Sequence, residues 1–77
     1  MLKLKLINET ANLLRYEYYP EGKESSGYII VEKGKCIKEF SKSENDEKGI
    51  YIRHALKRIR EYISNSEYET QDIVAWY

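Results

Sequence analysis

The sequence predicts a single α+β domain: an antiparallel meander of about four strands, one helix packed on one face, and a short C-terminal strand. Three observations support this β-β-β-β-α-β order. The first half of the chain contains four short strand-like segments separated by turn-forming residues. One later segment repeats apolar residues at helical spacing, and the chain closes on β-branched and aromatic residues. The length of 77 residues allows one domain, residues 1–77.

The first two strands are predicted by alternation. Residues 2–7 alternate apolar and basic side chains, which is the period of a strand with one buried face. Turn-forming residues 8–12 follow, and residues 13–19 resume the alternation, so the two segments predict a hairpin. Residues 20–27 begin with a proline, which cannot donate to a sheet ladder, and are otherwise polar or small. They predict a loop.

A second hairpin is expected from residues 28–31 and 36–40. The first of these segments is rich in β-branched and aromatic residues, and Gly34 between them supplies the positive φ of a tight turn. The sequence leaves open whether this turn contains two or three residues. Because that choice decides which side chains share a face, the register stays open too.

The helix is expected to begin near Asp46, within a polar segment that holds several N-cap residues. The poor helix formers 64–66 end it, and residues 72–77 predict the closing strand. On a helical wheel, an apolar stripe is formed by Ile52, Ala55, Leu56, Ile59, Tyr62 and Ile63. The expected core contains Leu4, Leu14, Ile30, Ile52, Leu56, Ile59, Ile63 and Trp76.

The composition excludes several classes of protein. Thirteen basic and thirteen acidic residues cancel, so no net field attracts the chain to nucleic acid or anionic lipid. The mean hydropathy of −0.72 and the lack of a long apolar run exclude a membrane span. Cys36 is the only cysteine, which rules out a disulfide within the chain and predicts a cytoplasmic location. One cysteine and one histidine predict no metal site, and we expect no cofactor.

Several short stretches resemble a group of small hypothetical proteins of low-GC Gram-positive bacteria. They are residues 18–23, 26–28, 45–47 and 54–55 and the ending Val74-Ala75-Trp76-Tyr77. Together they extend over most of the chain. The resemblance implies a bacterial cytosolic setting and no particular chemistry, so it assigns no functional residue.

Catalysis is not expected from the two residues best suited to it. His54 lies about 140° from the centre of the apolar stripe, which predicts a surface or interface position outside the helix-facing core. Cys36, beside Ile37 on an expected strand, is predicted to be a small buried apolar residue. A Cys36–His54 pair stays open, although no flanking motif supports it.

Binding is the favoured class of function, because eight tyrosines are a large number for so small a fold. One helix covers one face of a sheet, so aromatic area is expected on the other face or at an edge, available to a protein partner or a second copy. The candidate residues are Tyr16, Tyr18, Tyr28 and Trp76. The alternative is that these side chains are ordinary core aromatics.

A weak single-stranded nucleic-acid-binding module is the second hypothesis. Residues 50–63 carry a net charge of +3, and Arg53, Lys57 and Arg60 lie on the flank of the helix beside its apolar stripe. Cations on the helix could hold phosphates while strand tyrosines stack on bases. An ordinary solvated helix face is the alternative explanation of these charges.

Overall fold

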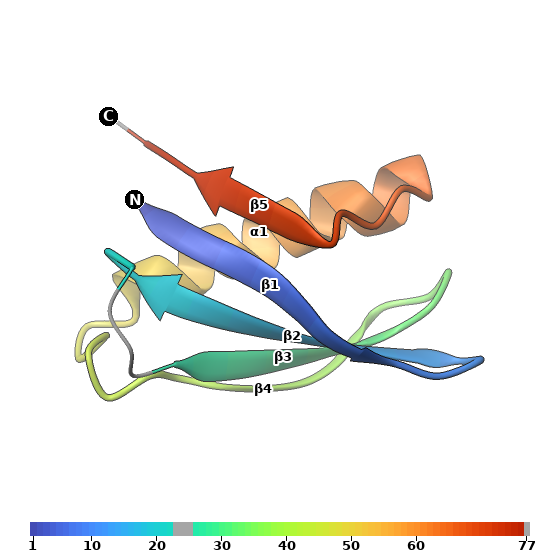
Figure 1. The fold of residues 1–77 in the computed structure, drawn as a ribbon, viewed down its shortest axis with the longest axis horizontal. Helices are drawn as coiled ribbons and strands as arrows, with labels where there is room; N and C mark the ends of the chain where they lie inside the picture. The colour runs from blue at the N-terminus through green and yellow to red at the C-terminus, as the bar shows by residue number, and fades with distance from the viewer. Residues whose placement is uncertain (23–25, 77) are drawn as a thin grey trace.

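In the computed structural model, residues 1–22 and 26–76 are described, and this part of the chain forms one antiparallel sheet of five strands crossed on one face by one helix (Figure 1). The elements are β1 (Leu2–Glu9), β2 (Leu13–Pro20), β3 (Gly27–Glu32), β4 (Ile37–Ser41), α1 (Ile50–Asn65) and β5 (Gln71–Val74). The strand order β4-β3-β2-β1-β5 is a four-stranded meander to which β5 returns beside β1. The predicted α+β fold is confirmed, and β4 and β5 form the two edges.

The core lies between α1 and one face of the sheet. Alternation along β2, along β3 and over the first residues of β1 places every second side chain toward the helix, and α1 contributes the apolar stripe that its spacing predicts. The buried hydrophobic residues are Leu2, Leu4, Leu14, Tyr16, Tyr18, Ile29, Val31, Ile52, Ala55, Leu56, Ile59, Tyr62 and Val74. Ile63 and Trp76, both expected in the core, are half-buried and pack against it.

The expected burial of Ile30 is wrong. Ile30 is paired with Arg15 of β2, and both side chains lie on the sheet face opposite α1. Its neighbours Ile29 and Val31 are fully buried instead. The physical reason is the period of two along a strand: all three residues are apolar, so composition alone does not say which of them face the helix.

The helix begins later than expected, at Ile50 instead of near Asp46. Residues 43–49 form turns, in which the Asp46 amide donates to the Ser43 carbonyl and the Gly49 amide donates to the Asp46 carbonyl. Gly49 has a φ of 71°, which lies outside the helical region and separates these turns from α1. Asp46 still caps the helix, but its side chain does so from outside the first turn.

Two other boundaries differ from the prediction. Pro20 is a buried strand residue paired with Leu2, and it lies beyond the last pair of β2 with β3, at Tyr18 and Gly27. Its missing N–H therefore interrupts no ladder on that side. The closing strand is shorter than residues 72–77, since β5 ends at Val74, and Tyr77 lies outside the described residues, as do residues 23–25 of the expected loop.

Candidate functional site

Two of the four candidate binding residues lie in the core. Tyr16 and Tyr18 have no exposed area, because their positions on β2 face α1. In the folded chain they offer no surface to a partner, and they correspond to the alternative in which strand tyrosines are core aromatics. Their hydroxyl groups instead hold two connections of the fold in place.

The Tyr18 hydroxyl joins the sheet to the start of α1. It donates to Asp46 Oδ2 at 3.0 Å and accepts from the Ser43 amide at 2.8 Å. The Asp46 carboxylate, only 3% exposed, also accepts from the amides of Tyr51 and Ile52 at 3.1 and 2.8 Å. These amides belong to the first turn of α1, where a carboxylate is favoured by the unpaired N–H groups and the helix dipole.

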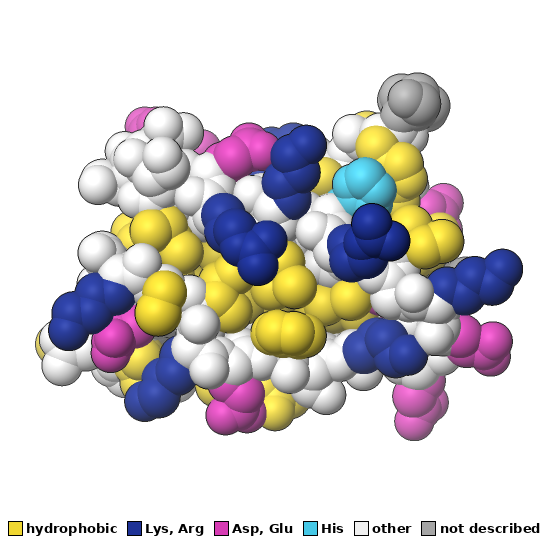
Figure 2. Space-filling model, turned by 180° about the vertical axis from the view of Figure 1, so that it is seen from behind, with side chains coloured by type: hydrophobic (Ala, Val, Ile, Leu, Met, Phe, Trp, Pro, Cys, Tyr) yellow, Lys and Arg dark blue, Asp and Glu magenta, His cyan; other side chains and the backbone are white. Residues whose placement is uncertain are grey.

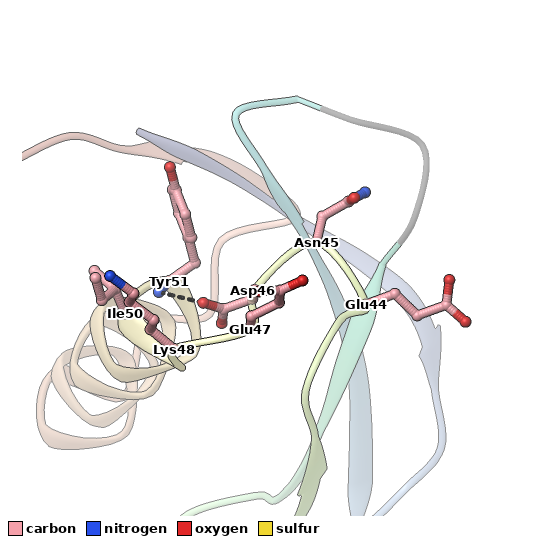
Figure 3. Close-up of a pocket in the computed structure, with 7 residues that line it drawn as sticks. All are labelled: Glu44, Asn45, Asp46, Glu47, Lys48, Ile50 and Tyr51. Carbon is pink, nitrogen blue, oxygen red and sulfur yellow. Dashed lines mark hydrogen bonds between the residues drawn. The ribbon is translucent and has the colours of Figure 1, made fainter.

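A surface pocket borders this connection, between residues 44–48 and the beginning of α1 (Figure 3). In the figure, the Asp46 side chain points to the backbone of Tyr51, while Glu44 points away from the helix. Because Asp46 already accepts three hydrogen bonds from the protein, we assign it to capping the helix and to no chemistry in the pocket.

A second connection holds β5 against α1. Asp72 accepts hydrogen bonds from the Tyr62 hydroxyl at 2.5 Å and from Arg58 at 3.0 Å, and the Tyr16 hydroxyl donates to the Glu69 carbonyl at 2.5 Å. The rings of Tyr16 and Tyr62 lie 5.8 Å apart, within the range of a favourable aromatic pair. The connection is structural, since each polar group in it has a partner within the protein.

These buried tyrosines predict loss of stability at alkaline pH. Burial raises the pKa of Tyr16, Tyr18 and Tyr62 above the ordinary value, and the hydrogen bond to Asp72 raises that of Tyr62 further. The folded state therefore favours the neutral phenol. The stabilising contribution of the neutral phenol groups is complete below about pH 10. As the pH rises further, the free energy of unfolding falls by up to about 1.4 kcal/mol per pH unit for each group.

Urea unfolding between pH 8 and pH 11 measures this loss. The slope of the unfolding free energy against pH should become less steep in Tyr62→Phe. An unchanged slope above pH 10 in that variant would contradict the assignment.

Tyr28 lies on the sheet face opposite α1, where its ring and hydroxyl are already engaged. The guanidinium of Arg15 lies 4.5 Å from its ring centroid, and its hydroxyl donates to Glu39 at 2.7 Å. Nearby, the hydroxyl of Tyr19 donates to Glu17 at 2.7 Å. This open face therefore carries aromatic residues as expected, but each is paired with charged side chains of the same face.

Trp76 lies at a third place, beside α1. Its ring stacks on His54 with centroids 3.9 Å apart and an angle of 9° between the planes, and it meets Tyr51 edge-on at 5.3 Å. His54 is half-buried by this contact and lies outside the helix-facing core, as its position on the wheel predicts. The structure thus separates the four candidate aromatics into the core, the open sheet face and the flank of α1.

The basic residues Arg53, Lys57 and Arg60 are exposed on α1. Tyr51 and Arg58 lie on the flank toward the C-terminal segment, where Tyr51 contacts Trp76 and Arg58 bonds to β5. The geometry of the helix places Arg53 and Arg60 on the other flank, which faces β4. Within residues 1–22 and 26–76, no ion pair engages the three cations.

β4 brings apolar side chains to the same side of the molecule. The register of β3 and β4 shifts between Ile30 and Val31, so that Ile37 pairs with Val31 and Phe40 with Ile29. Ile37 and Phe40 therefore both face α1, although residues three positions apart lie on opposite faces of a regular strand. Ile37 is half-buried, and Phe40 is 53% exposed. Figure 2 shows hydrophobic side chains gathered below the Lys and Arg side chains of the helix.

Sequence reasoning missed this arrangement, which we name the β4 edge surface. It consists of the open backbone edge of β4, Ile37 and Phe40, and the cations Arg53, Lys57 and Arg60. In an antiparallel sheet, every second residue of an edge strand turns its N–H and C=O outward, where they can pair with another strand. The surface thus offers backbone groups, exposed apolar area and positive charge together.

The expected burial of Cys36 is wrong, because it is exposed in the turn before β4. In the described part of the chain no hydrogen bond joins Cys36 to His54, whose ring stacks on Trp76 instead. Residues 1–22 and 26–76 contain no cluster of His, Cys, Asp and Glu able to hold a metal ion. Over the same residues, α1 is too short and too polar to cross a bilayer.

Comparisons of the chain with protein families, with curated proteins and with solved structures give no match. The resemblance to small proteins of low-GC Gram-positive bacteria therefore stays a prediction from the sequence. Among the surfaces of the described residues, the β4 edge surface is the strongest candidate for binding.

Proposed function

We propose that this protein is a small, non-catalytic binding protein of the bacterial cytoplasm, and that it takes up a protein partner at the β4 edge surface. One observation carries the proposal: Phe40, 53% exposed, lies on an edge strand on the side of α1 that carries Arg53 and Arg60, and these two cations make no ion pair with the described residues. An aromatic side chain next to open backbone groups is a common anchor for a binding partner.

The open sheet face is a weaker candidate for the same role. Tyr28 is covered by Arg15 and bonded to Glu39, so a partner would have to displace existing interactions to reach its ring. Phe40 has no polar group to satisfy, and covering it gains the free energy of burying apolar area. The edge therefore binds a partner at lower cost than the face does.

Site-specific photo-cross-linking in cells tests the proposal. A benzophenone amino acid in place of Phe40 should form an adduct with a distinct protein, because this side chain is exposed at the surface proposed to bind. The matched control carries the same group in place of Tyr28, on the opposite face. An adduct that also appears from position 28, or no adduct from position 40, would contradict the proposal.

Nucleic-acid binding is the second candidate, favoured by the same three cations. Against it, Tyr16 and Tyr18 are buried and Tyr28 lies on the opposite face, so the strand tyrosines and the helix cations do not form one surface. Phe40 is the strand aromatic that lies on the same side of the sheet as the helix cations, as stacking on a base beside a bound phosphate requires. Binding of this kind would weaken steeply with added salt.

A further inference from the structure

We infer that the partner contributes an extended segment of about five residues, which adds to β4 as a new edge strand and directs carboxylates toward α1. This inference rests on the proposed function and names the chemistry of the occupant. It combines three features of the β4 edge surface: the length of the open strand, the apolar side chains that face α1, and the positive charge of the exposed helix residues.

The strand sets the length and the face of the segment. β4 has five residues, so it offers about 17 Å of edge at roughly 3.3 Å per residue. A new strand would lie about 4.8 Å away, with alternate side chains on the side of α1. Apolar side chains at these positions would cover Ile37 and Phe40, as cross-strand neighbours do within a sheet.

The charges determine which side chains the segment carries on each of its faces. Arg53 and Arg60 lie on the flank of α1 that faces this edge, and Lys57 lies next to them on the solvent side of the helix. Carboxylates on the same side of the added strand would come within reach of Arg53 and Arg60. The other face of β4 presents Glu39, which pairs with Ile30 and repels acidic residues there. The preferred segment therefore alternates, with apolar and acidic residues toward α1 and neutral or basic residues away from it.

The same charges argue against a second copy as the occupant. Antiparallel pairing of two β4 strands would form one continuous sheet with both helices on the same side. The flank carrying Arg53 and Arg60 would then face its own copy across the junction, and Glu39 would approach Glu39. Repulsion between like charges favours an acidic segment of a different protein.

Selection from a random ten-residue peptide library displayed on phage, with the full chain immobilised, tests the inference. The enriched peptides should share a pattern in which every second residue is apolar or acidic and the residues between them are neutral or basic. Their binding should weaken on the order of tenfold in the double variant Arg53→Glu, Arg60→Glu. The matched control is Lys3→Glu, Lys5→Glu, which makes the same change of charge on the opposite sheet face and should leave affinity unchanged.

Amide NMR shifts of the bound chain separate failure of the inference from failure of the proposed function. Peptides without acidic residues that shift β4 amides would overturn the acidic segment and leave the edge as a binding site. If a single-stranded oligonucleotide shifted the same amides and no peptide were enriched, the inference and the proposed function would both be overturned in favour of nucleic-acid binding. Enriched peptides that shift β5 or open-face amides, or no binding by either probe, would also overturn both.

Discussion

Replacement of Asp46 by alanine is expected to lower the free energy of unfolding by about 3 kcal/mol or more. The carboxylate is buried and accepts hydrogen bonds from the Tyr18 hydroxyl and from the amides of Tyr51 and Ile52. Alanine would leave the buried hydroxyl without its acceptor, at a cost of about 1–3 kcal/mol, and the first turn of α1 without its cap, at a cost of about 0.5–2 kcal/mol. Urea unfolding followed by circular dichroism measures the change.

Two further variants identify the source of this loss. Tyr18→Phe removes one donor, and a double-mutant cycle with Asp46→Ala should show coupling of about 1 kcal/mol or more between the two side chains. Glu44→Ala is the matched control, because Glu44 is an exposed carboxylate of the same turn. Equal stability of Asp46→Ala and Glu44→Ala would show that the cap does not hold α1 in place.

Replacement of Gly27 by alanine is expected to destabilise the sheet by about 3 kcal/mol, at the upper end for an overpacked site. A Cβ atom there would lie 2.2 Å from Tyr18 Cε1, 2.4 Å from the Ser41 carbonyl oxygen and 2.8 Å from the Ser43 amide nitrogen. Two of these atoms belong to the backbone and cannot rotate away. The substitution should therefore disturb the end of β4, and the thermal midpoint should fall markedly.

Gly34→Ala provides the comparison for this variant. Gly34 has a φ of 72°, but nothing lies within 4 Å of the position that a Cβ would occupy. Its substitution should cost about 1 kcal/mol from backbone strain alone. If both alanine variants lost the same small amount of stability, close packing around Gly27 would not be a determinant of the fold.

The sequence was sufficient to predict the elements and their order, because two periodicities are clear in it. The alternation of Leu2 and Leu4 with lysines predicts the buried face of β1, and that face is observed. The stripe from Ile52 to Ile63 predicts the face by which α1 packs on the sheet, with Ile63 at its half-buried margin. Both patterns are local, so neither depends on register.

The candidate site depends on register, which explains why sequence reasoning did not find it. Ile37 and Phe40 would face opposite sides of a regular strand, and they share a face only because the ladder shifts at Lys38. The burial of Tyr16 and Tyr18, in contrast, follows from the alternation of β2, because the face that carries Leu14 carries both tyrosines and the other face carries Arg15 and Glu17. The role of Asp46 depends on a contact with Tyr18, 28 positions away.

The most direct test of the central claim compares cross-links from the two edges of the sheet. Phe40 on β4 and Ile73 on β5 are both exposed, at 53% and 60%. A photoreactive amino acid in place of either residue would therefore be accessible to a partner. Binding at the β4 edge surface predicts a distinct protein adduct from position 40 and none from position 73. The same adduct from both positions, or an adduct from position 73 alone, would contradict the assignment of binding to the β4 edge surface.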